Sequence, residues 1–390
     1  MSGVSTTEVV VIGAGINGAS LAWHLANRGI RVTVVERDFP ASGPTGRSSA
    51  IVHAFYLEPE LSLLAYRGTE TLRNLRELTG GDAGFKAVGM LWVVGPEGAP
   101  EWRQAVTRIR KEGADIETLT VEQFATLAPG FTTDGIALAV WEPTCGYADP
   151  AGATNALIRG ARDRGAQVRT GTPTARIITQ GGRAVGIETM AGERIAADAV
   201  VVAAGPWTRA LLASAGVDLP LHVERHALAV VDMPGMARRV LPFAWCDDPL
   251  LHYARPEGED LILVGLWAGG GTAHRNLQAE RPQPVTDLDH YRQDADQHEC
   301  AEILAHMLPR VPALQHYGLR RGYAGLYDMS PDDLPVIGPI PGVDNLYVIA
   351  GSSGHGFKLG PAVGEEVARL IVEGTALLLE PFRPERLLKG

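Results

Sequence analysis

The chain has 390 residues, of which 45% are hydrophobic and 21% charged, and its formal net charge is −10. This length allows a large core in two domains, whereas the acidic balance and the lack of a basic run argue against nucleic acid as a partner. Cys145, Cys246 and Cys300 lie far apart without CxxC spacing. We therefore expect no disulfide framework and no metal site, and a reducing cytoplasm as the compartment.

The N-terminal segment predicts a nucleotide-binding unit. An apolar run starts at Val9, and glycines interrupt it after four residues, so it is too short for a signal sequence or a membrane span. Residues 9–12 instead predict a buried strand, residues 19–28 a helix, and residues 31–36 a second strand. Two consecutive parallel strands joined by a helix form a βαβ unit, and we expect no membrane contact.

Further elements predict two kinds of domain that alternate along the chain. Helical patterns are expected at residues 61–78, 101–112, 151–164, 287–307 and 362–373. Short strands are expected around Val168, Ile177 and Ile187, and at residues 195–202, 227–231, 261–264 and 346–350. The strands at 227–231 and 261–264 are typical of a separate antiparallel sheet. The predicted fold class is therefore α/β, with a Rossmann-like nucleotide-binding domain and an interleaved antiparallel-sheet (α+β) domain for the substrate.

The domain boundaries follow from this alternation. The nucleotide-binding domain is predicted to be discontinuous, with residues 1–85, 150–215 and 330–390. The substrate-binding domain is predicted to contain residues 86–149 and 216–329.

A dinucleotide fingerprint lies between the first strand and the first helix. Gly13, Gly15 and Gly18 have the GxGxxG spacing, which provides a tight turn, close approach to a pyrophosphate and close packing of the helix on the sheet. The start of the helix offers free N–H groups to phosphates. Glu36 ends the second strand, where its carboxylate can accept hydrogen bonds from ribose hydroxyls. The fingerprint predicts a bound dinucleotide without separating NAD from FAD.

Three further motifs carry a resemblance to a known family. They are residues 46–52 (GRSSAIV), 201–207 (VVAAGPW) and 350–360 (AGSSGHGFKLG). Together with the fingerprint they resemble the D-amino-acid-oxidase-like superfamily of FAD oxidoreductases. Within it, the likeness is to sarcosine oxidases, glycine oxidases and the catalytic subunits of heteromeric sarcosine and proline dehydrogenases. Residues 323–332 and 335–338 belong to the same likeness, which covers nearly the whole chain.

The resemblance implies FAD, with its ADP half on the βαβ unit and its ring between the two domains. The residues assigned to the cofactor are Gly13, Gly15, Ile16, Asn17, Gly18, Glu36, Arg37, Gly46, Arg47, Ser48, Ser49, Thr174, Ala204, Gly205, Trp207, Gly354, His355, Gly356, Phe357 and Lys358. Gly354, Gly356 and Gly360 are expected to clear room for a flat ring. Two groups are expected to stabilise an anionic reduced flavin: the N-terminus of the helix after Pro361, and the side chain of Lys358.

Four residues are assigned to the substrate side by the same resemblance. Lys358 matches the lysine that holds the substrate carboxylate, and Tyr253 and Tyr327 match tyrosines that line the pocket. His53 stands where the family carries an arginine. This replacement weakens the bidentate grip on a carboxylate, because a neutral imidazole offers only one donor. The predicted reaction oxidises the C–N bond of a sarcosine-, glycine- or proline-like substrate by hydride transfer to flavin N5, giving an imine. No general base is nominated, because desolvation can keep the amine neutral.

Two positions depart from the family's oxidases. Gly325 replaces the cysteine that attaches the flavin in some members, so non-covalent FAD is expected. Leu263 stands where sarcosine oxidases carry a lysine that promotes reduction of oxygen. Without this positive charge, the sequence favours a dehydrogenase that passes its electrons to an acceptor other than oxygen. An oxidase that uses oxygen stays open. The chain is expected as a homo-oligomer or as a subunit of a heteromeric complex.

Two other functions stay open. One is a flavoenzyme for a different substrate, such as a hydroxy acid, a glycerol-3-phosphate-like molecule or a cyclic imino acid in a tailoring pathway. The other is a non-catalytic FAD subunit that relays electrons. Lys358 with Tyr253 and Tyr327 favours catalysis, because a relay needs no anion site beside the flavin. A phosphate substrate calls for more arginines near the flavin ring than we can locate there. The only close pair of arginines expected in that region, Arg320 and Arg321, is expected at the end of a strand.

Overall fold

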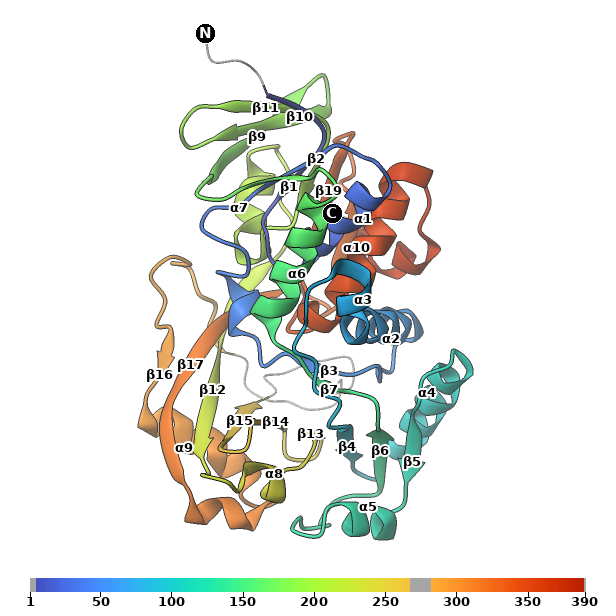
Figure 1. Ribbon diagram of the computed structural model, residues 1–390, viewed down its shortest axis with the longest axis vertical. Helices are drawn as coiled ribbons and strands as arrows, with labels where there is room; N and C mark the ends of the chain where they lie inside the picture. Colours follow the sequence, from blue (N-terminus) through green and yellow to red (C-terminus); the bar gives the residue numbers. More distant parts are fainter. Residues whose placement is uncertain (1–4, 267–281, 389–390) are drawn as a thin grey trace.

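The computed structural model describes residues 5–266 and 282–388, and in these ranges the strands form two large sheets, one above the other in Figure 1. The first sheet has eight described strands in the order β18-β19-β11-β1-β2-β8, with β10 paired to β11 and β9 to β10. Their bounds are β1 Ser5–Ile12, β2 Val32–Val35, β8 Gln167–Arg169, β9 Thr174–Gln180, β10 Arg183–Thr189, β11 Arg194–Val202, β18 Val336–Pro339 and β19 Leu346–Ala350.

The centre of the first sheet is parallel, and its central strand is covered on both faces. β1 pairs in parallel with β2 and β11. Val9 and Val11 belong to one core cluster, and Val10 and Ile12 belong to another on the opposite face. Strands of this kind are continuous apolar runs because both faces are buried, which explains why the run after Val9 forms a strand.

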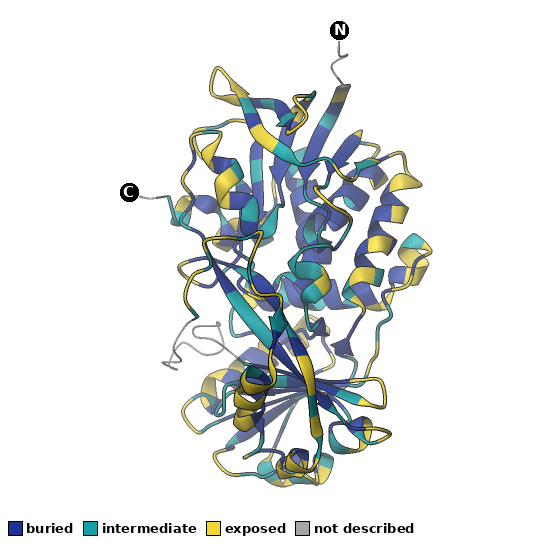
Figure 2. Cartoon of the chain, turned by 90° about the vertical axis from the view of Figure 1, so that its left-hand side faces the viewer, coloured by how far each residue is buried: buried dark blue, intermediate teal, exposed yellow. Residues whose placement is uncertain are grey.

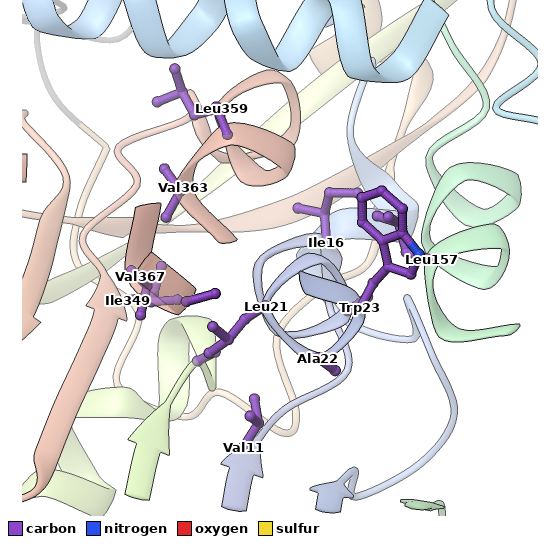
Figure 3. Packing of buried hydrophobic residues seen from close by; sticks show 14 of the residues in the cluster. Val11, Ile16, Leu21, Ala22, Trp23, Leu157, Ile349, Leu359, Val363 and Val367 are labelled. Carbon is purple, nitrogen blue, oxygen red and sulfur yellow. The ribbon is translucent and has the colours of Figure 1, made fainter. Parts of the chain in front are cut away.

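Three helices pack on one face of this sheet. They are α1 (Ile16–Asn27), α6 (Pro150–Arg162) and α10 (Gly356–Glu373), and α1 lies between the other two. Figure 3 shows Leu21 of α1 facing Val367 of α10. On its other side, Trp23 lies against Leu157 of α6. The N-termini of α1 and α10, 340 residues apart in sequence, are thereby held near each other.

The second sheet has nine described strands in the order β16-β17-β12-β15-β14-β13-β4-β6-β5. Their bounds are β4 Met90–Val94, β5 Glu117–Leu119, β6 Leu138–Glu142, β12 His222–Asp232, β13 Ala244–Asp247, β14 His252–Glu257, β15 Leu261–Leu266, β16 Asp294–Ala295 and β17 Gly318–Met329. All pairs in it are antiparallel except β13 with β4. Figure 2 shows its strands largely buried, whereas exposed residues gather on the surrounding helices and loops.

Shorter elements connect the two sheets. β3 (Ile51–Val52) and β7 (Gly146–Tyr147) pair with each other between them. The remaining helices are α2 Pro59–Arg73, α3 Leu75–Thr79, α4 Ala99–Lys111, α5 Val121–Leu127, α7 Thr208–Ala213, α8 Ala237–Val240 and α9 Gln297–Met307. The 3-10 helices are η1 Pro44–Arg47, η2 Gly205–Trp207, η3 Pro312–His316, η4 Leu377–Phe382 and η5 Pro384–Arg386. Within the described ranges, no helix is both long and apolar enough to cross a membrane.

Three predicted helices are corrected. The helix expected at 287–307 begins only at Gln297, because Asp296 caps it by accepting a hydrogen bond from the amide of Glu299 and the two preceding residues pair with β17. The helix expected at 61–78 is interrupted at Asn74. The last helix begins six residues earlier than expected, so Pro361 lies inside α10 rather than before it. The division into domains stays a prediction.

Candidate active site

The fingerprint glycines occupy positions that leave no room for a side chain. A Cβ on Gly18 would lie 2.0 Å from the carbonyl oxygen of Gly13, and a Cβ on Gly13 would lie 2.4 Å from that of Ala203. Gly13 also has a φ of +105°, in the region that favours glycine. The turn after β1 can therefore keep its shape only with glycine at both positions.

The side chain of Glu36 completes this turn. Its carboxylate accepts hydrogen bonds from the amides of Ala14 at 2.8 Å and Asp38 at 2.9 Å. The following segment returns to the start of α1, where Ile16 donates its amide to the hydroxyl of Thr45 at 3.2 Å. The first amides of a helix lack partners within the helix and suit an anion. The turn, the helix start and the acid thus fit the ADP half of a dinucleotide.

A cavity that opens to solvent lies between residues 48–53, the start of α10 and the second sheet. Its lining residues are Ser48, Ser49, Ile51, His53, Met90, Trp92, His226, Tyr253, Leu266, Tyr327, Met329, Asp333, Ser353, Gly354, His355, Phe357 and Lys358. Both domains that the sequence predicts contribute to this wall. All four residues expected on the substrate side lie in it, together with six of those expected at the flavin, and Lys358 belongs to both sets.

Lys358 lies in the first turn of α10 and is almost fully buried, with 7% of its surface exposed. Its Nζ donates a hydrogen bond of 3.0 Å to the hydroxyl of Tyr56, which also lies 2.8 Å from Nδ1 of His355. Burial lowers the pKa of Lys358 to about 7. Burial has removed water from the ammonium group of Lys358, and an anion in the cavity would compensate for that loss. This group is therefore suited to bind a carboxylate.

His53 is buried beside Lys358 and is neutral. Burial, followed by the positive charge of Lys358, holds its pKa well below the usual value. Its ring centroid lies 4.9 Å from that of Tyr56 and 4.6 Å from that of Trp92. Among the described residues, Nδ1 of His53 has no hydrogen-bond partner. A neutral imidazole in the wall offers one polar atom to a ligand and no charge.

Two tyrosines and a histidine form an aromatic wall. The hydroxyls of Tyr253 and Tyr327 lie 3.4 Å apart, and the ring of His226 stacks on Tyr327 with centroids 4.0 Å apart. Two glycines make room for these rings. A Cβ on Gly265 would lie 2.3 Å from the ring of Tyr253, and a Cβ on Gly354 would lie 2.6 Å from that of Tyr327.

Gly360 does not open the cavity as expected. A Cβ at this position would lie 3.0 Å from the side chains of Ile16 and Asn17, so its lack of a side chain allows α10 to pack on α1. The reason is the earlier start of α10, which turns residue 360 toward the neighbouring helix. Gly356 is the first residue of α10, and Gly354 lies just before its N-cap residue, His355.

Other residues assigned to the cofactor lie outside the cavity wall. Arg37 stacks on Trp207 with its guanidinium 4.3 Å from the ring centroid, and it forms an ion pair of 2.6 Å with Asp289. Ala204 and Gly205 begin η2, Thr174 begins β9, and Gly46 and Arg47 lie in η1. Arg320 and Arg321 pair with Asp232 and Asp294 near the start of β17.

Sequence reasoning missed Tyr56, His226 and Glu142. The carboxylate of Glu142 accepts hydrogen bonds from the amide of Ala54 at 2.7 Å and from Nε1 of Trp92 at 2.9 Å, which fixes the segment that carries His53 and Tyr56. Burial raises the pKa of Glu142 to about 7. Only one signal for these residues was present in the sequence, the alternation of ionisable residues at 222, 224 and 226 in a strand.

Comparison with known proteins agrees with this geometry. A sequence profile of the DAO family, described as FAD dependent oxidoreductase, matches residues 8–370. The chain is 30% identical over 374 residues to 4-methylaminobutanoate oxidase (formaldehyde-forming) of Paenarthrobacter nicotinovorans, covering 94% of this chain and 44% of that protein. It is 29% identical over 403 residues to human mitochondrial sarcosine dehydrogenase, covering 99% and 41%. The chain thus spans less than half the length of these two relatives.

A solved structure shows the same architecture. The crystal structure of L-proline dehydrogenase from P. horikoshii superposes with a TM-score of 0.86 at 28% identity, covering 98% of both chains. The predicted fold class, a Rossmann-like FAD-binding domain with a sheet-rich second domain, is thereby confirmed.

Proposed function

The chain belongs to the DAO family of FAD-dependent oxidoreductases, and within that family we propose that it oxidises the C–N bond of a small amine that carries a carboxylate. The observation that carries the proposal is the buried ammonium group of Lys358 in an aromatic cavity. The relatives named above act on 4-methylaminobutanoate, sarcosine and L-proline according to their names. Each of these molecules combines an amine with a carboxylate, which supports a sarcosine-, glycine- or proline-like substrate here.

FAD, when bound, supplies an acceptor for the hydride equivalent that leaves the carbon beside the amine nitrogen. The turn from Gly13 to Gly18 and the carboxylate of Glu36 would hold its ADP half. Ser48, Ser49 and the start of α10 would lie at its ring. We propose that it is held without a covalent bond to residue 325, because this position is Gly325 in place of the family's cysteine.

The chain's own residues bind and orient the substrate. Lys358 pairs with the carboxylate, and the rings of Tyr253 and Tyr327 enclose the amine end. His53 is neutral and adds a single polar contact, so the clamp depends mainly on one cation. Because these groups are buried, they also exclude water and strengthen the ion pair between Lys358 and the carboxylate.

The electron acceptor depends on the surroundings of position 263. Leu263 is buried on β15, where its partner on β14 is Arg255. The guanidinium of Arg255 is compensated, because it pairs with Glu257 at 2.6 Å and donates to the carbonyl oxygens of Ser49 and Pro256. Leucine stands at residue 263 in place of the family's lysine, and the cation paired with it among the described residues, Arg255, is compensated. We therefore favour an acceptor other than oxygen.

Anaerobic mixing of the flavin-loaded protein with sarcosine, proline, glycine and D-alanine tests the proposal. We expect at least one of them to bleach the flavin absorbance, whereas lactate and glycerol 3-phosphate leave it unchanged. Bleaching by lactate or by glycerol 3-phosphate alone would favour the alternative substrates, and bleaching by none of them would favour an electron relay. Admitting air to the reduced protein then tests the effect of Leu263 on the reaction with oxygen. We expect slow reoxidation of the flavin in the wild type, and Leu263→Lys should accelerate it about tenfold or more.

A further inference from the structure

The segment 48–50, which joins η1 to β3, has a strained backbone. Ala50 has a φ of +51°, in the left-handed region that residues other than glycine rarely adopt. Its amide donates a hydrogen bond of 3.0 Å to the hydroxyl of Ser48, and its carbonyl oxygen accepts one of 3.0 Å from the amide of Ala148. Ser48 and Ser49 line the cavity. Such a conformation costs free energy and persists only where the surrounding structure holds it.

Arg255, on β14 of the second sheet, contacts the segment 48–50. Only 4% of its surface is exposed. Its Nε donates a hydrogen bond to the carbonyl oxygen of Ser49, and its guanidinium lies 4.3 Å from the ring centroid of Tyr147. Tyr147 belongs to β7, which pairs with β3 directly after the segment. The buried guanidinium is therefore in contact with the segment and with the strand that supports its continuation.

The other donors of Arg255 have partners of their own. Nη1 donates a hydrogen bond of 3.0 Å to the carbonyl oxygen of Pro256 and pairs with the carboxylate of Glu257 at 2.6 Å. The side chain of Glu257 is 48% exposed, so this carboxylate balances the charge from the solvent side. A guanidinium group can serve these partners and Ser49 together, because its donors point in several fixed directions, whereas the three donors of a lysine share one atom. The contact with Ser49 thus depends on the shape of the guanidinium as well as on its charge.

We propose that Arg255 is a positioning residue for the cofactor, because it holds the segment 48–50 in the conformation that presents its two serines to the flavin ring. Arg255 acts through the carbonyl oxygen of Ser49. The proposal rests on the placement of Ser48 and Ser49 at the ring under the proposed function, but it holds for any substrate. Without the guanidinium, Ala50 should leave the left-handed region, and the two serines should move away from the ring.

Hydrogen–deuterium exchange of backbone amides measures how firmly the segment is held. Exchange is followed in protein saturated with FAD, where the wild-type peptide that covers residues 46–52 should exchange slowly. Arg255→Ala should speed this exchange, and should raise the dissociation constant of FAD, each by about tenfold or more. Guanidinium chloride at millimolar concentration, far below a denaturing one, should enter the space that the side chain leaves and restore both values. Sodium chloride at the same ionic strength should restore neither.

Two further variants complete the test. Arg238→Ala, which changes a more exposed arginine on α8, should behave as the wild type in both measurements. Arg255→Lys keeps the charge without the planar fork of donors, so its exchange at residues 46–52 should still be about threefold or more faster than in the wild type. This variant decides the matter if Arg255→Ala fails to fold.

Three results would overturn the proposal. The first is wild-type exchange at residues 46–52 in Arg255→Ala or in Arg255→Lys. The second is a loss in Arg255→Ala that guanidinium does not restore, because the side chain would then act only by filling space. The third is faster exchange with an unchanged affinity for FAD, because the segment would then not serve the ring. Neither measurement contains an amine, so failure of every amine to bleach the flavin would overturn the proposed function alone.

Discussion

The ammonium group of Lys358 donates a hydrogen bond of 3.0 Å to the hydroxyl of Tyr56, which lies 302 residues earlier in the chain. The same hydroxyl lies 2.8 Å from Nδ1 of His355. Burial raises the pKa of Tyr56 well above its ordinary value, so the phenol is neutral. The cation is thus oriented by an uncharged partner and has lost solvation, which prepares it for an anionic ligand.

Lys358→Met should weaken binding of a carboxylate while FAD stays bound. A hydrogen bond to a charged group contributes roughly 1.5–3 kcal/mol, so the dissociation constant should rise by about one to two orders of magnitude. Titration of the flavin spectrum with propionate, which carries no amine to be oxidised, measures this. Lys111→Met, which changes an exposed lysine at the end of α4, is the matched control. Equal affinities in the two variants would contradict the role of Lys358.

Binding of propionate should also weaken as the pH rises through about 7. The pKa of Lys358 is lowered to about 7, so its ammonium form is complete below this pH and is lost above it. The dissociation constant should rise by up to about tenfold per pH unit above the pKa, as expected for one ionisation. The same titration from pH 5.5 to 9 measures this dependence. In Lys358→Met the slope should vanish, and an equal slope there would assign the ionisation to another group.

Gly18→Ala should prevent FAD from binding. The added Cβ would lie 2.0 Å from the carbonyl oxygen of Gly13, so either α1 or the turn has to move. The ratio of flavin to protein after dialysis measures the effect. Gly130→Ala is the control, because a Cβ at Gly130 meets no described atom within 4 Å. Full occupancy in Gly18→Ala would show that the turn does not hold the cofactor.

Glu142→Gln should flatten the dependence of stability on pH between about 4.5 and 7. Burial raises the pKa of Glu142 from 4.5 to about 7, so in this interval the folded state binds a proton that the unfolded state has released. The free energy of unfolding should therefore fall as the pH rises, by on the order of a few kcal/mol from this group.

Urea denaturation of the wild type and the variant at pH 5 and pH 7.5 measures this difference. Glu101→Gln, at an exposed residue in the first turn of α4, should keep the wild-type dependence. A slope in Glu142→Gln equal to that of the wild type would mean that Glu142 keeps an ordinary pKa.

The sequence alone determined the family and the fold class, and both are confirmed. It also located the turn from Gly13 to Gly18 with Glu36, because a tight turn between a strand and a helix depends on residues close together in the chain. The boundaries of α10 were less predictable. Proline usually ends or begins a helix, but Pro361 lies inside α10 because the packing of this helix on α1 outweighs its local preference.

Only the tertiary structure decided which side chains meet in the cavity. Tyr56, Glu142 and His226 come from a connecting segment and from two strands of the second sheet, and no short motif marks them. His226 lines the cavity, Tyr56 contacts Lys358, and Glu142 fixes the segment that carries Tyr56. These contacts are set by packing rather than by spacing in the chain. Local sterics determine a turn or a strand, whereas the polar partners of Lys358 depend on how the two sheets are placed.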